Sequence, residues 1–204
     1  MQMGRLAKAS GYALVAALMV AGSGTRSAAQ SHDHGGEKSE PHKPTPQENE
    51  LVQTVRAATE KFKDVTNVAG PGPDYALTFG CVSGGDFGAM GLHYLKGSIL
   101  HDGEIDKNDP EIILFEPTRN GGIRITGADY IVLVSEWEQK HKGEMPPSID
   151  GQWFHLFDAP NRFGLDPFYT LHVWAWKDNP NGTFTNWNPN VSCDAFNPRS
   201  QSQN

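Results

Sequence analysis

The chain has 204 residues, enough for one domain or at most two, and a formal net charge of −7 from 17 Lys and Arg against 24 Asp and Glu. The acidic balance excludes a nucleic-acid partner, because no row of cations is present to neutralise phosphates. The 22 Gly and 14 Pro residues favour many turns over long helices. Neither a long heptad nor a Gly-X-Y repeat is present, which excludes the coiled-coil and collagen classes.

The first 29 residues have the pattern of an export signal. Arg5 and Lys8 precede an apolar run from Tyr12 to Ala21, and small residues at 27–29 occupy the expected cleavage positions. No other segment is apolar enough to cross a bilayer, so we expect no membrane span after signal cleavage. The sequence therefore predicts an exported bacterial protein, periplasmic or secreted, with an uncleaved N-terminal anchor as the alternative.

Residues 30–47 lack apolar periodicity and are expected to form a disordered tail. The tail contains three histidines, His32, His34 and His42. If the signal is cleaved after Ala29, the free amine, two amides and the imidazole of the third residue can form a square-planar copper or nickel site. Cyclisation of the new N-terminal Gln30 would block that amine. A tail that only keeps the chain in solution is the alternative.

One amphipathic helix is predicted over about 46–66. Thr45 and Glu48 have the spacing of a capping box, with Pro46 at the first helical position. Apolar residues then recur at helical spacing from Leu51 to Val65. The Gly and Pro residues at 70–73 end the helix.

Six strand-like runs separated by turn residues follow the helix. They cover Tyr75–Val82, Gly91–Lys96, Glu111–Phe115, Ile123–Trp137, Trp153–Phe157 and Tyr169–Trp176. We therefore predict a single α+β domain over 48–198, in which the N-terminal helix precedes a curved or barrel-like antiparallel sheet of about six strands. Residues 199–204 form a C-terminal tail.

The two cysteines, Cys81 and Cys193, are expected to form a disulfide. An exported chain with an even number of cysteines usually oxidises them. The bond would tie the first strand to the C-terminal segment. Two separate buried thiols are the alternative.

Three histidines lie inside apolar, strand-like runs: His93, His155 and His172. Neutral imidazole is a good ligand for zinc, copper or iron, and Glu116 ends a neighbouring strand. We predict that these four side chains surround a transition metal with an open catalytic position, with Asp129 as a reserve ligand. Core histidines in a protein without metal are the alternative.

Tryptophans accompany these histidines along the predicted strands. Strand alternation places Trp174 and Trp176 on the side of His172, and Trp153 on the side of His155. If these sides meet inside a curved sheet, the three tryptophans form a wall for a small apolar or aromatic ligand. The pattern points to a metalloenzyme of oxidative or hydrolytic type. The alternatives are a metal-free module for a small hydrophobic ligand, and copper or zinc buffering through the histidine tail.

Five short motifs stand out along the predicted domain. They are Gly88-Ala-Met-Gly-Leu-His-Tyr94, Leu114-Phe-Glu-Pro117, Phe168-Tyr-Thr-Leu-His-Val-Trp-Ala-Trp-Lys177, Asn179-Pro-Asn-Gly182 and Trp187-Asn-Pro-Asn-Val-Ser-Cys193. The chain resembles a family of uncharacterised exported bacterial proteins in these motifs, over roughly residues 50–195. The resemblance implies export and a single domain, and it implies no activity, cofactor or catalytic residue.

Overall fold

The structure, a computed structural model, describes residues 44–69 and 74–197. The predicted export signal, the three histidines of the N-terminal tail and the C-terminal tail lie outside the described residues. These three features and the predicted bounds of the domain stay predictions. None of the helices within the two described ranges combines the length and the apolar character that crossing a bilayer requires.

Helix α1 (Pro46–Thr59) begins with the predicted capping box. The backbone N–H of Glu48 donates to Thr45 Oγ1 at 3.2 Å, and the N–H of Thr45 donates to Glu48 Oε2 at 2.6 Å. The predicted continuation to residue 66 is wrong, because a 3-10 turn, η1 (Glu60–Lys63), and a short helix, α2 (Thr66–Ala69), follow instead. Asp64 explains the break, since its carboxylate accepts hydrogen bonds from both the N–H and the hydroxyl of Thr66 and competes with a continuing helix.

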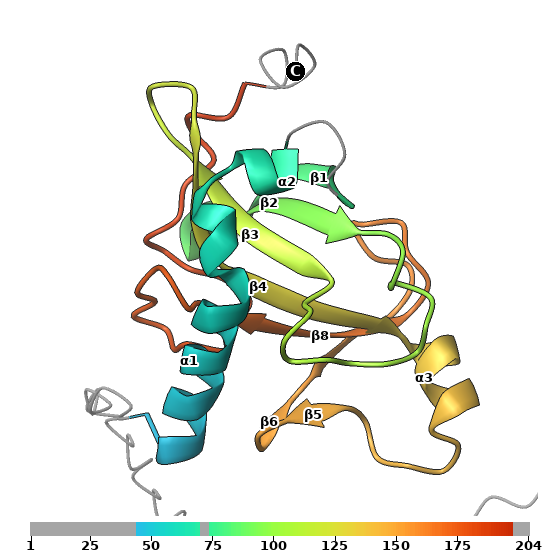
Figure 1. Cartoon of the computed structure of the whole chain (residues 1–204). Coiled ribbons are helices and arrows are strands. Elements are labelled where there is room, and N and C mark those ends of the chain that lie inside the picture. The colour runs from blue at the N-terminus through green and yellow to red at the C-terminus, as the bar shows by residue number, and fades with distance from the viewer. Residues whose placement is uncertain (1–43, 70–73, 198–204) are drawn as a thin grey trace, which may run out of the picture. The chain divides into compact units, whose positions relative to one another are not determined.

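Six strands form one antiparallel sheet in the order β1-β2-β3-β4-β8-β7 (Figure 1). They are β1 (Tyr75–Ser83), β2 (Ala89–Lys96), β3 (Ile112–Pro117), β4 (Ile123–Leu133), β7 (His155–Phe157) and β8 (Phe168–Val173). A small second sheet pairs β5 (Ser148–Ile149) with β6 (Gln152–Trp153), and the short helices η2 (Gly85–Phe87) and α3 (Val134–Lys140) lie between strands. The mixed class with a six-stranded antiparallel sheet is confirmed. The sheet is not closed into a barrel, because β1 and β7 remain at its edges.

Two predicted strands differ from the observed ones. The strand predicted over 123–137 ends at Leu133, where the partner strand β8 also begins, with Phe168 opposite Leu133. Beyond that pair one more hydrogen bond follows, from the N–H of Val134 to the carbonyl of Pro167 at 2.8 Å, and α3 starts at Val134. The run predicted over 153–157 divides between β6 and β7, because Phe154 between them pairs with neither sheet and donates its N–H to the carbonyl of Pro147 at 3.1 Å.

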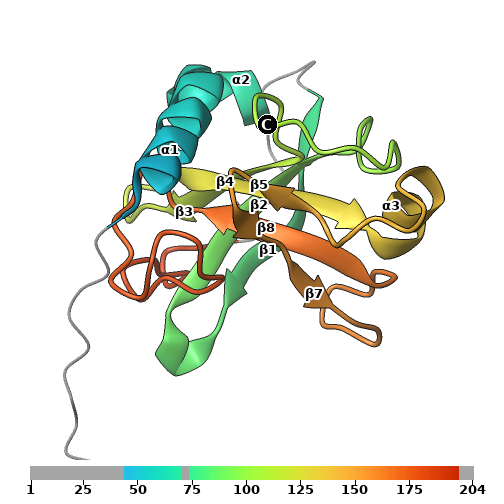
Figure 2. The same ribbon diagram turned by 90° about the horizontal axis from the view of Figure 1, so that it is seen from below.

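The two faces of the large sheet carry different residues. Side chains alternate along each strand, so Tyr130 of β4 and Leu171 of β8 point to one face, where Leu51 and Val55 of α1 pack on them. Helix α1 lies across one face of the sheet (Figures 1 and 2). The other face has its own apolar cluster, which includes Ile112, Leu114, Ile131, Leu133 and Phe168. Three buried polar side chains, His93, Asp129 and His172, share that second face.

A disulfide joins Cys81 in β1 to Cys193, as predicted. Cys81 lies opposite Leu92 of β2, and Cys193 packs on the second-face cluster. The bond therefore fixes the C-terminal segment to the β1 edge of the sheet.

We expect the double variant Cys81→Ser, Cys193→Ser to lose about 4–5 kcal/mol of unfolding free energy, because the bond closes a loop of 112 residues in the unfolded chain. Urea denaturation of the oxidised protein and of the variant measures the difference. The reduced wild-type protein is the control and should match the variant. A loss below about 1 kcal/mol would mean that strain in the folded state cancels the entropic gain.

Glu111 is a buried carboxyl group directly before β3. Its Oε2 accepts a hydrogen bond from the backbone N–H of Ile131 at 3.1 Å. Burial nevertheless raises its pKa from 4.5 to about 8, because the charged form loses its hydration. The folded state therefore binds more protons than the unfolded chain between these two values, and stability falls as the pH rises across that window.

The variant Glu111→Gln should be more stable than the wild type at pH 8, and the difference should shrink towards pH 5. The amide keeps the hydrogen-bond acceptor for Ile131 and removes the charge. The difference in unfolding free energy between the variant and the wild type therefore grows by up to about 1.4 kcal/mol for each unit by which the pH rises. Urea unfolding at both pH values measures it. Glu138→Gln, at an exposed position on α3, controls for the general effect of losing one charge. An equal gap at both pH values would contradict the raised pKa.

Candidate metal centre

Three strands bring together two imidazoles and a carboxylate. His93 lies in β2, Asp129 in β4 and His172 in β8, and Asp129 is directly opposite His172 in the β4/β8 register. One ligand atom from each lies within 4.8 Å of the other two, and all three side chains are buried. Because metal–nitrogen bonds are about 2.0–2.1 Å, two ligands of one metal lie up to about 4.2 Å apart. In a tetrahedral site the ligand atoms are about 3.4 Å apart, so the three side chains would close by up to about 1.4 Å around a shared ion.

Sheet curvature produces this meeting. β2 and β8 are separated by β3 and β4, so His93 and His172 would be about 14 Å apart in a flat sheet with strands 4.8 Å apart. Their ring centroids are only 5.9 Å apart, at an interplanar angle of 76°. The sheet therefore curls towards its second face, and the three polar side chains converge on the concave side.

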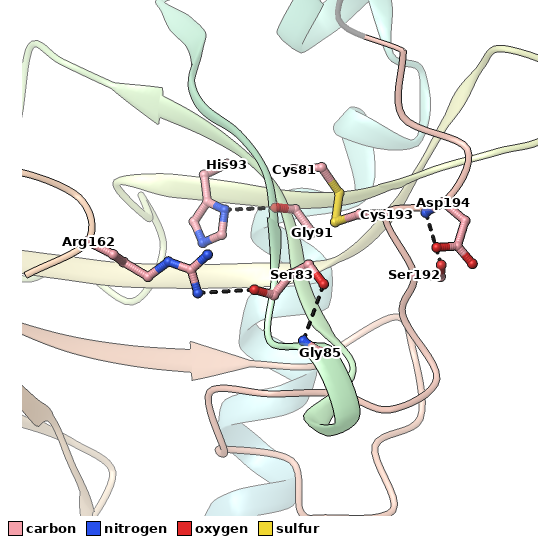
Figure 3. Close-up of a disulfide and its surroundings, with 9 residues drawn as sticks. All are labelled: Cys81, Ser83, Gly85, Gly91, His93, Arg162, Ser192, Cys193 and Asp194. Atoms are coloured by element: carbon pink, nitrogen blue, oxygen red, sulfur yellow. Dashed lines mark hydrogen bonds between the residues drawn. A yellow bond between two sulfur atoms is a disulfide. The ribbon is translucent and has the colours of Figure 1, made fainter.

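Hydrogen bonds fix the orientation of His93. Its Nδ1 lies 3.1 Å from the carbonyl oxygen of Gly91 (Figure 3), which assigns the proton to Nδ1 and leaves the Nε2 lone pair free. Gly91 adopts φ +88°, and a Cβ there would come within 2.3 Å of the Phe115 carbonyl oxygen. Only glycine can therefore turn this carbonyl towards the ring.

Asp129 and His172 are held differently. Asp129 Oδ1 accepts a hydrogen bond from the hydroxyl of Thr170 at 2.5 Å. His172 Nδ1 lies 3.4 Å from the same oxygen, but neither ring nitrogen of His172 has a hydrogen-bond partner among the described residues. Buried polar groups are nearly always hydrogen-bonded, and leaving one unsatisfied costs about 1–3 kcal/mol. Apart from this long contact with Asp129, the ring of His172 is oriented by packing, and no described residue forms a hydrogen bond with either of its nitrogens.

Burial sets the protonation states. Loss of hydration lowers the pKa of His172 to about 3 and that of His93 to about 4, so both imidazoles are neutral at physiological pH. The same effect raises the pKa of Asp129 to about 6, so its carboxyl is largely ionised at neutral pH. The centre then offers two neutral imidazoles and one buried negative charge, the ligand states that a transition-metal cation requires.

A small apolar cavity adjoins the three ligand groups. Its volume is about 20 Å³, and a cavity needs about 10–15 Å³ by this measure to hold one water molecule. Besides the three ligand groups and Thr170, its lining consists of Phe79, Met90, Ile112, Ile131, Phe157, Phe163, Leu165 and Phe168. The open side of the centre therefore faces hydrocarbon and has room for a very small molecule.

The structure does not bring the other two predicted ligands into this group. Glu116 lies at the end of β3, where Arg124 and Lys177 both bind its carboxylate. His155 is exposed in β7, opposite Thr170 of β8. Their role as metal ligands stays a prediction. Asp129, the reserve ligand, takes the place expected for Glu116.

Trp174 and Trp176, two of the three predicted ligand-binding tryptophans, both line a cavity of about 250 Å³ beside α1, and Trp153 is not part of that lining. Trp174 is buried beside the centre, with its ring centroid 5.9 Å from that of His172, and donates its indole N–H to the carbonyl of Thr185. Trp176 donates its indole N–H to Thr59 Oγ1 at 2.9 Å, next to α1. Trp153 is 55% exposed in β6. Ligand binding by these residues stays a prediction.

The sequence contains only weak indications of the roles of two residues of the centre, Asp129 and Thr170. Asp129 stands as a lone acid inside the apolar run Ile123–Leu133, and that isolation is the signal that could have ranked it above Glu116. Thr170 gave no signal, because threonine is common in strands. Its hydroxyl orients the Asp129 carboxylate only through the β4/β8 register.

No protein-family model, curated protein or solved structure matches the chain. These comparisons do not bear on the resemblance to exported bacterial proteins, which stays a prediction.

Replacing His172 by leucine should stabilise the metal-free protein by about 1–2 kcal/mol, because it removes two unsatisfied nitrogens from the interior. Urea unfolding in the presence of a chelator measures the change. His101→Leu is the matched control, at a side chain that is 65% exposed, and should leave stability nearly unchanged. A large loss of stability in His172→Leu would show that this imidazole has a stabilising partner in the folded protein.

Proposed function

We propose that the protein is an exported metalloprotein whose His93–Asp129–His172 centre binds one transition-metal ion. The observation that carries the proposal is the imidazole of His172, which is fully buried with both nitrogens unsatisfied beside a second imidazole and a carboxylate. A histidine with a purely structural role would normally donate or accept a hydrogen bond. An ion between the three groups supplies the missing partner and neutralises the buried charge of Asp129.

The types of ligand atom limit which metal can bind. Two imidazoles and one carboxylate suit zinc, copper or iron, and do not suit magnesium or calcium, which prefer all-oxygen sites. Three protein ligands with a free position are typical of catalytic sites, whereas structural zinc sites usually have four. We therefore propose a metal-dependent enzyme of oxidative or hydrolytic type, in which the bound ion polarises or activates a small molecule. Neutral His93 and His172 hold the ion, and Thr170 orients Asp129.

The disulfide favours an oxidising compartment. Structural disulfides persist in secreted and periplasmic proteins and are rare in the cytosol. Together with the export signal predicted over residues 1–29, the bond supports a periplasmic or secreted location.

The alternatives have less support. A metal-free module in which the imidazoles orient the ligand needs room beside them, and the 20 Å³ cavity there is far smaller than the roughly 300 Å³ of ordinary small-molecule sites. The cavity of about 250 Å³ that Trp174 and Trp176 line is not lined by the imidazoles. Metal buffering through His32, His34 and His42 concerns residues outside the described ranges. Substitution of these three histidines distinguishes metal buffering by the tail from metal binding at the proposed centre.

We expect the purified full chain to carry one zinc, copper or iron ion per molecule by elemental analysis. His172→Ala should lose the ion, because one of three ligands is removed. The tail variant His32→Ala, His34→Ala, His42→Ala should retain it. His155→Ala tests the remaining histidine and should also retain the ion, since His155 lies outside the group of three.

His101→Ala, at a histidine whose side chain is 65% exposed and which is not one of the three clustered ligand groups, is the matched control for His172→Ala. Absence of metal after reconstitution with each of the three ions would contradict the proposal. Loss of metal in the tail variant alone would replace it with the buffering function.

A further inference from the structure

A wall of half-buried apolar side chains lies between the candidate metal centre and solvent. Phe79 comes from β1 and Phe157 from β7, whereas Phe163 and Leu165 come from the loop 158–167 that joins β7 to β8. The three ligand groups behind this wall are each at most 3% exposed. Any molecule that reaches the open side of the centre must therefore fit behind these four side chains or displace them.

Ring contacts run across the wall to the ligands. The centroid of Phe163 lies 5.2 Å from that of Phe79, and Phe79 lies 6.2 Å from the His93 ring. Phe163 also contacts Phe157 and Phe168, at 6.0 and 5.9 Å. These are edge-on aromatic contacts that give the wall a defined packing.

The loop is braced so that Phe163 keeps this position. The side chain of Asn161 accepts hydrogen bonds from the N–H groups of Phe163 and Leu165 and donates to the carbonyls of Asp158 and Leu165. Arg162 Nη1 donates to the carbonyl oxygen of Ser83 at 3.0 Å, which attaches the loop to the β1 edge of the sheet (Figure 3). The wall is thus held both from within the loop and from the opposite side of the site.

We propose that Phe163, together with Phe79, restricts the ligand at the open position of the metal to a molecule of one or two heavy atoms, such as water or a diatomic molecule. The inference rests on the proposed function and adds the substrate class. A cavity of about 20 Å³ holds one water molecule or a diatomic one. Apart from Thr170 and the three ligand groups its lining is hydrocarbon, so a larger polar molecule would lose most of its hydration without replacement.

The test uses the full chain loaded with Co(II), whose visible absorption bands respond to a new ligand. Cyanide, with two heavy atoms, and imidazole, with five, are the probes. The wild type should bind cyanide and exclude imidazole. Phe163→Ala should bind both, with imidazole affinity at least about tenfold above that of the wild type. Metal content is measured alongside to detect stripping by cyanide.

Two further variants make the comparison secure. Phe163→Leu removes less volume and should show an intermediate gain, which covers the case that the alanine variant folds poorly. Phe87→Ala is the matched control, because Phe87 is 67% exposed in η2 and is not part of the wall. It should behave as the wild type.

A second readout needs no metal. Diethyl pyrocarbonate modifies neutral imidazoles and is much larger than the cavity, so His172 in the metal-free wild type should react slowly. Phe163→Ala should raise that rate at least about tenfold, while the exposed His101 in the same chain reacts at an unchanged rate. Peptide mass spectrometry assigns the modified histidines.

The outcomes separate the size limit from the metal proposal. Imidazole binding by the wild type as tight as by Phe163→Ala overturns the limit, as does exclusion of imidazole by both alanine and leucine variants. If no Co(II) binds to the wild type, the proposed function fails. The rates of reaction with diethyl pyrocarbonate then test by themselves whether Phe163 restricts the size of molecules that reach His172. Equal His172 rates in the wild type and in Phe163→Ala overturn the size limit.

Discussion

Burial of two imidazoles and one carboxylate on an apolar sheet face is the constraint on which the rest of the structure depends. Removal from water keeps His93 and His172 neutral and makes the charge of Asp129 costly. Gly91 and Thr170 compensate two of the three groups by hydrogen bonds. The third, His172, is left unsatisfied, so the fold carries a cost that a cation between the three side chains would remove.

The two faces of the sheet have different roles: one carries the apolar core under α1, and the other carries the candidate metal centre. One face of the sheet is packed by α1 through an ordinary apolar core, which offsets the polar burial on the other face. The disulfide anchors the C-terminal segment at β1, the strand that also carries Phe79 and accepts the Arg162 hydrogen bond at Ser83. Strand β1, which helps to cover the centre, is therefore also the strand that the disulfide fixes. The loop 158–167 is attached to this strand through Arg162.

Charge pairing explains why the two candidate carboxylates differ. Glu116 meets Arg124 and Lys177 at the end of β3, so its charge is compensated by cations of the protein itself. Asp129 sits in mid-strand with Thr170 and His172 as its neighbours. The second carboxylate has a hydrogen bond from Thr170 but no Lys or Arg ion pair among the described residues, which is the arrangement that a metal ligand requires.

Residue types and spacing alone determined the capping box of α1, the disulfide, the six-stranded antiparallel class and two of the three residues of the centre. Some of these features depend on residues close in sequence, such as Thr45 and Glu48 in the capping box. Others have a single possible arrangement, because two cysteines can form one disulfide. Where α1 stops, where β4 loses its partner and which acid joins His93 and His172 were decided by tertiary structure. Strand order and curvature bring side chains that are three inter-strand spacings apart to a ring distance of 5.9 Å, and no periodicity in one strand encodes that.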